Sequence, residues 1–146
     1  MESINQNSPK IKKIKLDFKE SKYATGRRKK SIAKVWVKKG TGNIHVNGIK
    51  MSEYFKRPVH QIIVTRPLEI SDVSSNYDVK CSVKGGGLSG QAGAIILGIS
   101  KALISQDENL KKNLKKDKLT TRDSRVVERK KYGHRKARRS FQFSKR

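Results

Sequence analysis

The sequence has 146 residues, with 36 Lys and Arg against 12 Asp and Glu, and its formal net charge is +24. This length allows one modest domain with flanking arms, and such a charge excess indicates a polyanionic partner, because otherwise the charges only repel one another. The single cysteine, Cys81, excludes an internal disulfide, and with three scattered histidines it gives no metal-ligand spacing. We therefore expect no cofactor, and we predict that Cys81 is a small core residue.

Residues 1–22 are polar and rich in lysine, and they lack the continuous apolar core of a secretory signal. We predict a disordered leader here, whose apolar residues Ile11, Ile14, Leu16 and Phe18 lie against a partner surface. A membrane partner is not expected. The chain shows no run of about 18 apolar residues to span a bilayer, and its basic end has no amphipathic period.

The folded part is expected to begin near Tyr23. Residues 32–38 alternate between apolar and polar side chains, which predicts a half-buried strand with Trp36 on its polar face. Trp36 there either stacks on a base or, as we favour, packs under a neighbouring loop. The turn at residues 40–42 and the apolar alternation in 43–47, with His45 pointing outward, predict a hairpin with a second strand.

The next segments favour turns and helices. Asn47-Gly48 is typical of a turn, and Ser52 is the expected N-cap of a short helix through Phe55. Residues 59–65, between two prolines, fit either a helix or a strand, and we favour the helix.

A strand and a helix then flank a glycine-rich turn. Residues 77–84 alternate cleanly, with Tyr77, Val79, Cys81 and Val83 on one side, which predicts a strand with one apolar face. After the turn, apolar residues recur with helical spacing at Ala92, Ile95, Ile96, Ile99 and Leu103. Small residues (Gly93, Ala94 and Gly98) let this helix lie close to a sheet or to RNA. Leu110 and Leu114 then stand among lysines and predict a small basic helix.

The turn itself, residues 85–91, matches G-x-G-x-x-G through Gly85, Gly87 and Gly90. A dinucleotide site also needs a following parallel strand that ends in an acid, and a phosphate-binding loop of the Walker type needs Lys where Gln91 stands. Neither requirement is met. A polynucleotide phosphate held by backbone N–H groups and a purely structural turn remain, of which we favour the phosphate.

Residues 122–146 carry eleven Lys or Arg against Asp123 and Glu128, and they have no helical or alternating repeat. Such a segment cannot bury enough surface to order itself alone. A solvated solubility tail is one interpretation. However, rings are interleaved with the cations at Tyr132, His134, Phe141 and Phe143, and rings can stack on bases. We therefore predict an RNA-binding arm.

Several motifs in order resemble the small-subunit ribosomal protein S9 family. They are Y-A-T-G-R-R-K-K-S-I-A (23–33), G-G-G-L-S-G-Q (85–91), G-I-S-K-A-L (98–103) and the whole end from T-R-D-S-R to S-K-R (121–146). The resemblance implies an α/β (α+β) two-layer sandwich like the second domain of ribosomal protein S5, with a long extended basic C-terminal tail. The expected division is a leader at 1–22, a globular S9 domain at 23–121 and the tail at 122–146.

The resemblance also implies a place in the head of the small ribosomal subunit, beside neighbouring head proteins and without homo-oligomers. There the protein would bind the 3′ major domain of 16S-type rRNA, and its tail would reach P-site tRNA. The residues expected at rRNA are Arg27, Arg28, Lys29, Lys30, Gly85, Gly86, Gly87, Gly90, Gln91, Arg122, Arg125, Arg129, Lys130, Lys131, Arg135, Lys136, Arg138 and Arg139. Those expected at tRNA are Ser144, Lys145 and Arg146.

The bacterial form of the motifs indicates a ribosome of the bacterial cytoplasm or, alternatively, of a mitochondrial matrix. Two other classes of function stay open. One is an enzyme that uses the glycine turn for a mononucleotide, although no triad, carboxylate pair or metal cluster supports catalysis, and we expect no enzyme. The other is a free nucleic-acid chaperone or regulator, which would sediment apart from ribosomes.

Overall fold

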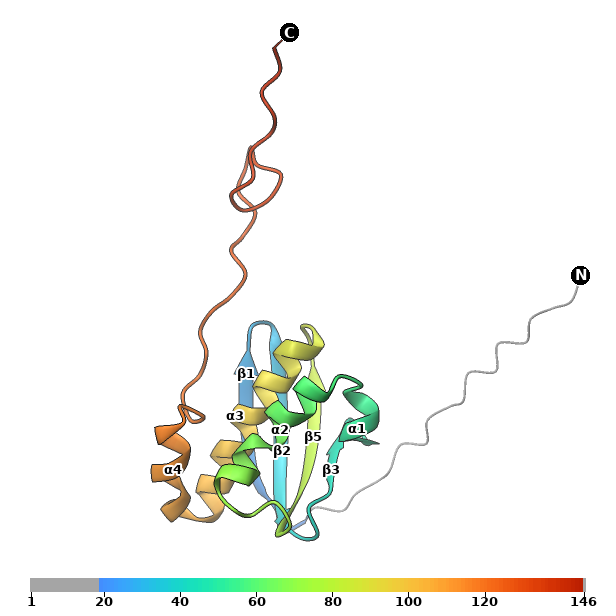
Figure 1. The fold of residues 1–146 in the computed structure, drawn as a ribbon, viewed down its shortest axis with the longest axis vertical. Coiled ribbons are helices and arrows are strands. Elements are labelled where there is room, and N and C mark those ends of the chain that lie inside the picture. The colour runs from blue at the N-terminus through green and yellow to red at the C-terminus, as the bar shows by residue number, and fades with distance from the viewer. Residues whose placement is uncertain (1–18, 146) are drawn as a thin grey trace, which may run out of the picture.

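Five strands form one mixed sheet in the computed structural model, which describes residues 19–145. The strands are β1 (Lys22–Arg28), β2 (Ser31–Lys39), β3 (Ile44–Val46), β4 (Ile49–Lys50) and β5 (Tyr77–Lys84), in the spatial order β1-β2-β5-β3-β4. The helices are α1 (Met51–Tyr54), α2 (Pro58–Ile70), α3 (Leu88–Gln106) and α4 (Lys111–Lys116), with a 3-10 turn at Glu108–Leu110. Figure 1 shows the helices gathered over one face of the sheet, so the chain has a mixed α/β fold.

The expected hairpin between residues 32–38 and 43–47 is wrong. β5 lies between β2 and β3, antiparallel to β2 and parallel to β3. The turn after β2 wraps around the start of β5, because the Asp78 carboxylate accepts hydrogen bonds from the backbone N–H groups of Thr41 (3.0 Å) and Asn43 (2.8 Å). Alternation along a strand shows which side chains are buried, but it does not show which strand lies next to it.

The hairpin that does form joins β1 and β2, with Arg28 paired to Ser31 across the turn. β1 was not expected, because Gly26 and the basic residues around it lack the apolar alternation of a strand. Trp36 does lie on the outer face, but it packs against Tyr23 of β1, with ring centroids 5.3 Å apart, rather than under a loop. The buried sides of β2 and β5 (Ala33, Val35, Val37; Tyr77, Val79, Cys81, Val83) are as predicted.

Residues 59–65 are helical, as favoured, but α2 continues through Pro67 to Ile70. It begins with Pro58 in its first turn, where a missing N–H costs nothing. The expected N-cap at Ser52 is wrong, because α1 begins at Met51 and Ser52 lies within it. The turn at Asn47-Gly48 is confirmed by the positive φ of both residues, 53° and 83°.

α3 is the central helix, and its close fit on β1 depends on small residues. A Cβ at Gly26 of β1 would meet the carbonyl oxygen of Ala94 and lie 2.6 Å from the backbone nitrogen of Gly98. By length and composition α3 is the one helix of the described chain that could cross a bilayer, which the sequence analysis did not expect. Eleven of its residues, including Ile95, Ile99 and Leu103, are buried, so α3 forms the core of the domain.

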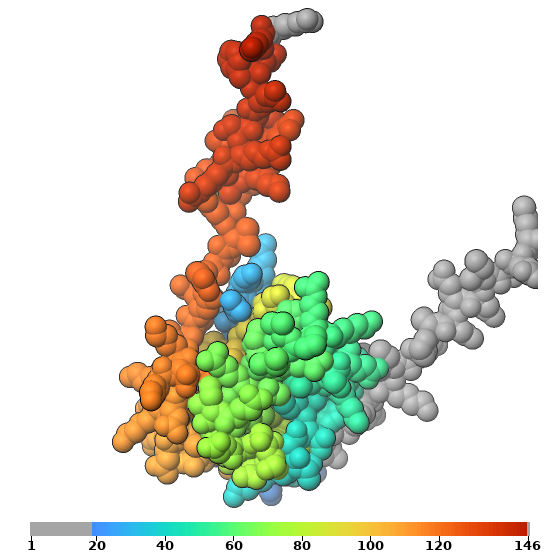
Figure 2. All heavy atoms as spheres, in the orientation of Figure 1, coloured from blue at the N-terminus to red at the C-terminus, as the bar shows by residue number. Residues whose placement is uncertain are grey.

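Residues after α4 leave the domain. The small basic helix is confirmed: Leu114 of α4 is fully buried, and the lysines around it are exposed. From Arg122 to Lys145 the chain forms no helix or strand. Figures 1 and 2 show this segment running from α4 past β1 and standing away from the domain. Of the predicted leader, residues 1–18 lie outside the described part of the chain.

Candidate nucleic-acid interface

The tip of the β1–β2 hairpin carries four consecutive cations, Arg27, Arg28, Lys29 and Lys30. Lys29 adopts a positive φ of 50°, which closes the tight turn between the strands. Three of the four residues are exposed, whereas Arg28 is half-buried and its side chain lies across Gly93 of α3. The hairpin therefore presents a short row of positive charge, with one member held against the domain.

The glycine turn lies beside this tip. The Ser31 hydroxyl donates a hydrogen bond to the carbonyl of Gly85 at 3.0 Å, and a Cβ at Gly86 would clash with the same hydroxyl. Gly85 and Gly86 both have positive φ, 77° and 60°, so their glycines are required by the turn itself. Gly87, which precedes the first residue of α3, has open space around it. Gly87 is therefore the one glycine of this turn that the fold does not require.

Gln91 is engaged within the protein. Its side-chain nitrogen donates to the carbonyl of Gly85 at 3.3 Å, and its side-chain oxygen accepts from the Tyr54 hydroxyl at 2.8 Å. Asn47 extends this network by bonding both backbone polar groups of Val83 (2.8 and 3.1 Å). These contacts hold the glycine turn to α1 and to the β3–β4 turn. The turn is therefore a braced structure at the end of β5.

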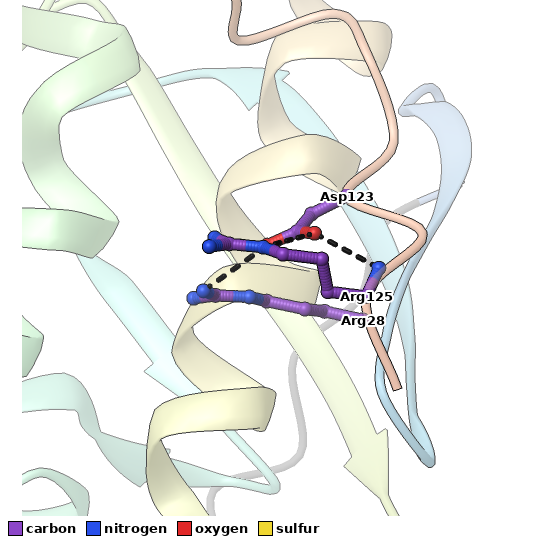
Figure 3. Close-up of polar contacts among 3 residues, drawn as sticks. All are labelled: Arg28, Asp123 and Arg125. Atoms are coloured by element: carbon purple, nitrogen blue, oxygen red, sulfur yellow. Dashed lines mark hydrogen bonds and ion pairs between the residues drawn. The ribbon is translucent and has the colours of Figure 1, made fainter. Parts of the chain in front are cut away.

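The base of the tail is joined to the hairpin tip through Asp123 (Figure 3). One carboxylate oxygen of Asp123 lies 3.3 Å from the Arg28 guanidinium. Arg125 binds the same carboxylate with two guanidinium nitrogens, each at 3.0 Å, and its backbone N–H donates to it at 3.0 Å. Asp123 thus connects β1 to the tail and also fixes the first bend of the tail. We call these three residues the Asp123 clamp.

The electrostatics of the clamp follow from this geometry. Hydrogen bonds from the Arg125 side chain and backbone, together with the charge of Arg28, hold the pKa of Asp123 well below its usual range. The same interaction raises the pKa of Arg125. Asp123 is therefore ionised at neutral pH, and one negative charge here is shared by two cations. The clamp keeps a net positive charge, which suits a phosphate ligand.

Two clefts border the clamp. One, of about 250 Å³, lies between α2, α3 and the tail, and its charged lining residues are Arg27, Arg28, Arg66, Lys118 and Asp123. The other, of about 290 Å³, lies between the hairpin tip and the tail and includes Lys29 and Arg125. Arg66 and Lys118 were not among the predicted interface residues, because Arg66 is an isolated cation within a helix and Lys118 is one of several lysines around the small basic helix. Only the fold places them beside Arg28.

The rest of the tail is exposed and carries most of its cations into solvent. Glu128 forms ion pairs with Lys131 (3.0 Å) and Arg138 (2.9 Å), which closes a loop within the tail. These two contacts, that with Arg138 first, lower the pKa of Glu128. The Arg135 guanidinium lies 5.5 Å from the centre of the Phe141 ring. Tyr132 and Phe143 are almost fully exposed, so their rings are open to a partner.

The structure brings some of the predicted interface together and leaves the rest apart. The hairpin tip, the glycine turn and Arg125 meet at one end of the sheet, through Ser31 and the Asp123 clamp. The expected tail contacts (Arg129, Lys130, Lys131, Arg135, Lys136, Arg138 and Arg139) lie on the projecting segment, as do Ser144 and Lys145. Arg122 is exposed beside the clamp. Arg146 lies outside the described residues.

Within residues 19–145, no group of three or more His, Cys, Asp or Glu side chains could hold a metal ion. Cys81 lies in the core of the sheet, where burial raises the pKa of its thiol. His60 bonds the Ser89 hydroxyl at 3.1 Å and packs on Phe55, which gives it a structural role. The polar features that gather at one place are cations and backbone turns, an arrangement suited to an extended anion.

Comparison with protein families shows which family the chain belongs to. A family model described as ribosomal protein S9/S16 matches residues 26–146. The match begins within β1 and includes the hairpin tip, the glycine turn, the Asp123 clamp and the whole tail. It covers well over half of the chain. The protein therefore belongs to the ribosomal protein S9/S16 family and has a structural role in the ribosome.

Proposed function

We propose that this protein is a structural constituent of the head of the small ribosomal subunit, where it binds the 3′ major domain of 16S-type rRNA beside neighbouring head proteins. The hairpin tip and the glycine turn provide a first contact with the RNA backbone. The tail provides a second contact, and its end reaches P-site tRNA through Ser144, Lys145 and Arg146. The division into a leader (1–22), a globular domain (23–121) and a tail (122–146) belongs to this proposal, as does the likeness of the fold to the second domain of S5.

The observation that carries the proposal is the meeting of the hairpin tip, the glycine turn and the base of the tail. Lys29 of the hairpin tip and Arg125 of the tail line one cleft, and Lys30 and Arg122, close to them in the chain, are exposed. The one carboxylate within this cluster, Asp123, is already paired with two cations. Contacts to the phosphate backbone need this kind of dense positive charge, and they fix position without reading sequence.

The tail supports the proposal by its shape. It leaves the domain with its cations and rings exposed, which suits a segment that orders against RNA. A ribosome of the bacterial cytoplasm is the proposed location, with a mitochondrial ribosome as the alternative. The proposed role is non-enzymatic, since it consists of binding and positioning.

The test is the salt dependence of binding to transcribed small-subunit rRNA. In one full-length variant, Arg135, Lys136, Arg138 and Arg139 are replaced by Ala. Because log K falls with log salt by about 0.7–0.9 for each phosphate neutralised, this variant should lose up to about 3.6 units of slope. Sedimentation of the wild-type protein with small subunits in a sucrose gradient is measured alongside.

A matched control replaces four exposed lysines on α3 and α4 by Ala and so removes the same charge. They are Lys101, Lys112, Lys115 and Lys116. If binding depends on the tail, the control should keep the larger slope. Equal losses in both variants would mean that net charge alone drives binding. A protein that sediments apart from the small subunit would contradict the ribosomal placement and favour a free nucleic-acid chaperone.

A further inference from the structure

Among residues 19–145, no helix covers the second face of the sheet. In β2 and β5 the residues facing α3 are buried, whereas the alternate residues are exposed or half-buried along the whole strands. Cross-strand register places these outer residues in rows over β1, β2 and β5. They are Tyr23, Thr25, Arg27, Ile32, Lys34, Trp36, Lys38, Asp78, Lys80, Ser82 and Lys84. We call this surface the open face.

An aromatic pair occupies one row of the open face. Tyr23 lies opposite Trp36 in the register, and their rings are tilted by 43° with centroids 5.3 Å apart. The Lys80 ammonium lies 5.9 Å from the centre of the Trp36 ring on the other side. Trp36 is therefore held between two neighbours. Tyr23, which is 49% exposed at the outer edge of the row, presents its ring to solvent.

The charge of the open face is positive. Lys34, Lys38 and Lys84 are exposed there, and Arg27 extends the same surface toward the hairpin tip. The one acid among these outer residues is Asp78. Although burial raises its pKa, hydrogen bonds from the backbone N–H groups of Asn43 and Thr41 lower the pKa overall. Its carboxylate therefore stays ionised and is bound by the turn after β2, and one negative charge stands against those of Arg27, Lys34, Lys38 and Lys84, so the open face is net positive.

The surface is also hollowed. A depression of about 110 Å³ between β2 and β5 is lined by Ile32, Lys34, Ser82 and Lys84. A wider one, of about 540 Å³, lies between β5 and the β3–β4 turn and includes Lys80 and Ser82. Both depressions have lysines on their walls. A flat apolar face for another protein would not combine exposed lysines, a ring at the edge and shallow hollows.

We propose that the open face is a second RNA-binding surface, which adjoins the hairpin tip at Arg27, is separate from the tail, and takes an unpaired RNA segment. A base stacks on Tyr23, and the phosphates on either side contact Lys34 and Lys38. A sheet that presents an aromatic ring among cations matches unpaired RNA, because every base offers a flat face and every linkage offers a negative charge. The inference rests on the proposed ribosomal function and adds a second, independent contact.

Trp36 makes the test direct, because it is the only tryptophan of the chain. The full-length protein is titrated with an end-labelled single-stranded RNA of 12 nucleotides. Anisotropy of the label reports binding anywhere on the protein, and Trp36 emission reports the open face. We expect Trp36 emission to change as the RNA binds. Tyr23→Ala should weaken the binding seen by Trp36 about tenfold, whereas Tyr23→Phe, which keeps the ring, should bind as the wild type does.

Charge is tested separately. Lys34→Ala with Lys38→Ala should lower the salt slope of the Trp36 signal by about 1.4, since each phosphate contact on a single strand contributes about 0.7. Lys112→Ala with Lys115→Ala removes the same charge from exposed positions of α4 and should leave that slope unchanged. Urea unfolding midpoints show whether each variant keeps the fold. An equal effect of both pairs would overturn the inference.

Ultraviolet cross-linking of purified small subunits gives the second readout. A nucleotide attached to the peptide of Tyr23 or Trp36 is the expected product. RNA binding seen by anisotropy without any change at Trp36 would overturn the open face and leave the tail as the binding site. Cross-links from Lys34 or Lys38 to another protein alone would likewise overturn it. If the protein does not sediment with small subunits, the proposed function fails, whatever Trp36 shows.

Discussion

Acidic residues hold local structure in both the globular part and the tail of this protein, but they bind different groups in the two regions. In the domain, Asp78 holds the turn after β2 around the start of β5. In the tail, Asp123 and Glu128 each bind two basic side chains. The domain is held mainly by its apolar core, whereas the described tail is shaped by these two acids. In a chain with a net charge of +24, these three acids each bind groups of the protein itself, and most cations stay available to a partner.

The packing of β1 on α3 offers the strongest way to break the domain without touching the tail. Gly26→Val would push a side chain into the backbone of α3 at Ala94 and Gly98. Overpacking of this kind costs about 3 kcal/mol, so the urea unfolding midpoint should fall sharply. Gly133→Val, at a tail position with a positive φ of 71°, strains the tail alone and should leave that midpoint unchanged. Equal stability of the two variants would contradict the close packing described here.

The glycine turn separates stability from RNA binding, because the fold requires glycine at some of its positions and not at others. Gly86→Val should destabilise the fold, owing to the positive φ of 60° and the clash with Ser31. Gly87→Val should leave the fold intact and, if the turn presents its N–H groups to a phosphate, should reduce incorporation into small subunits. Thermal melting and reconstitution are measured for each variant. A Gly87 variant that melts normally and assembles normally would make the turn purely structural.

The Asp123 clamp joins the two regions, and breaking it should affect the tail alone. Asp123→Ala should make the chain around Arg125 more accessible to trypsin, with no measurable change in the melting temperature, because exposed ion pairs contribute little to stability. Because the folded pKa of Asp123 is depressed, the clamp is present above the unfolded value of about 3.9 and is lost as pH falls through the lowered value. Trypsin digestion at pH 7 and pH 9 should therefore show the same protection in the wild type. Glu128→Ala, farther along the tail, is the matched control and should not expose Arg125.

The smallest effect is expected at the end of the tail. Deletion of Lys145 and Arg146 should leave assembly intact and speed tRNA dissociation from the P site by about fivefold or less, since exposed cation–phosphate contacts are weak. The measurement is the tRNA off-rate from purified small subunits at several salt concentrations. Unchanged off-rates throughout would remove the tRNA contact from the proposal. Failure to assemble would assign the two residues to rRNA binding instead.

Patterns among residues close together in the sequence were sufficient to predict much of the fold. The alternation in β5 and the helical spacing in α3 identified Val79, Cys81, Ile95 and Ile99 as buried, because burial imposes those periods directly. β1 was not predicted, since its inward positions are Ala24, Gly26 and the stem of Arg28, which are small or charged residues. Strand order was not predicted either, because it depends on partners that are distant in sequence.

In the candidate interface, too, local features could be predicted from the sequence, whereas those that depend on distant residues could not. Arg27 to Lys30, the glycine turn and the tail are evident from local composition. Arg66 and Lys118 are not, because only the folding of α2 and α4 around α3 brings them to the cleft beside Arg28. Asp123 looked like an exception in a basic tail. Its role appears only when Arg28, almost a hundred residues earlier, is seen beside it.

The ion pairs of Glu128 shorten the tail by closing a loop within it. The 24 residues from Arg122 to Lys145 would span about 80 Å if fully extended. Contact between Glu128 and Arg138, ten residues apart, withdraws those residues into the loop and leaves about 45 Å of reach. A phosphate that competes for Arg138 and Lys131 would release this slack. The reach of the tip therefore depends on a carboxylate far from it, and because the ion pairs of that carboxylate are exposed they hold the loop only weakly.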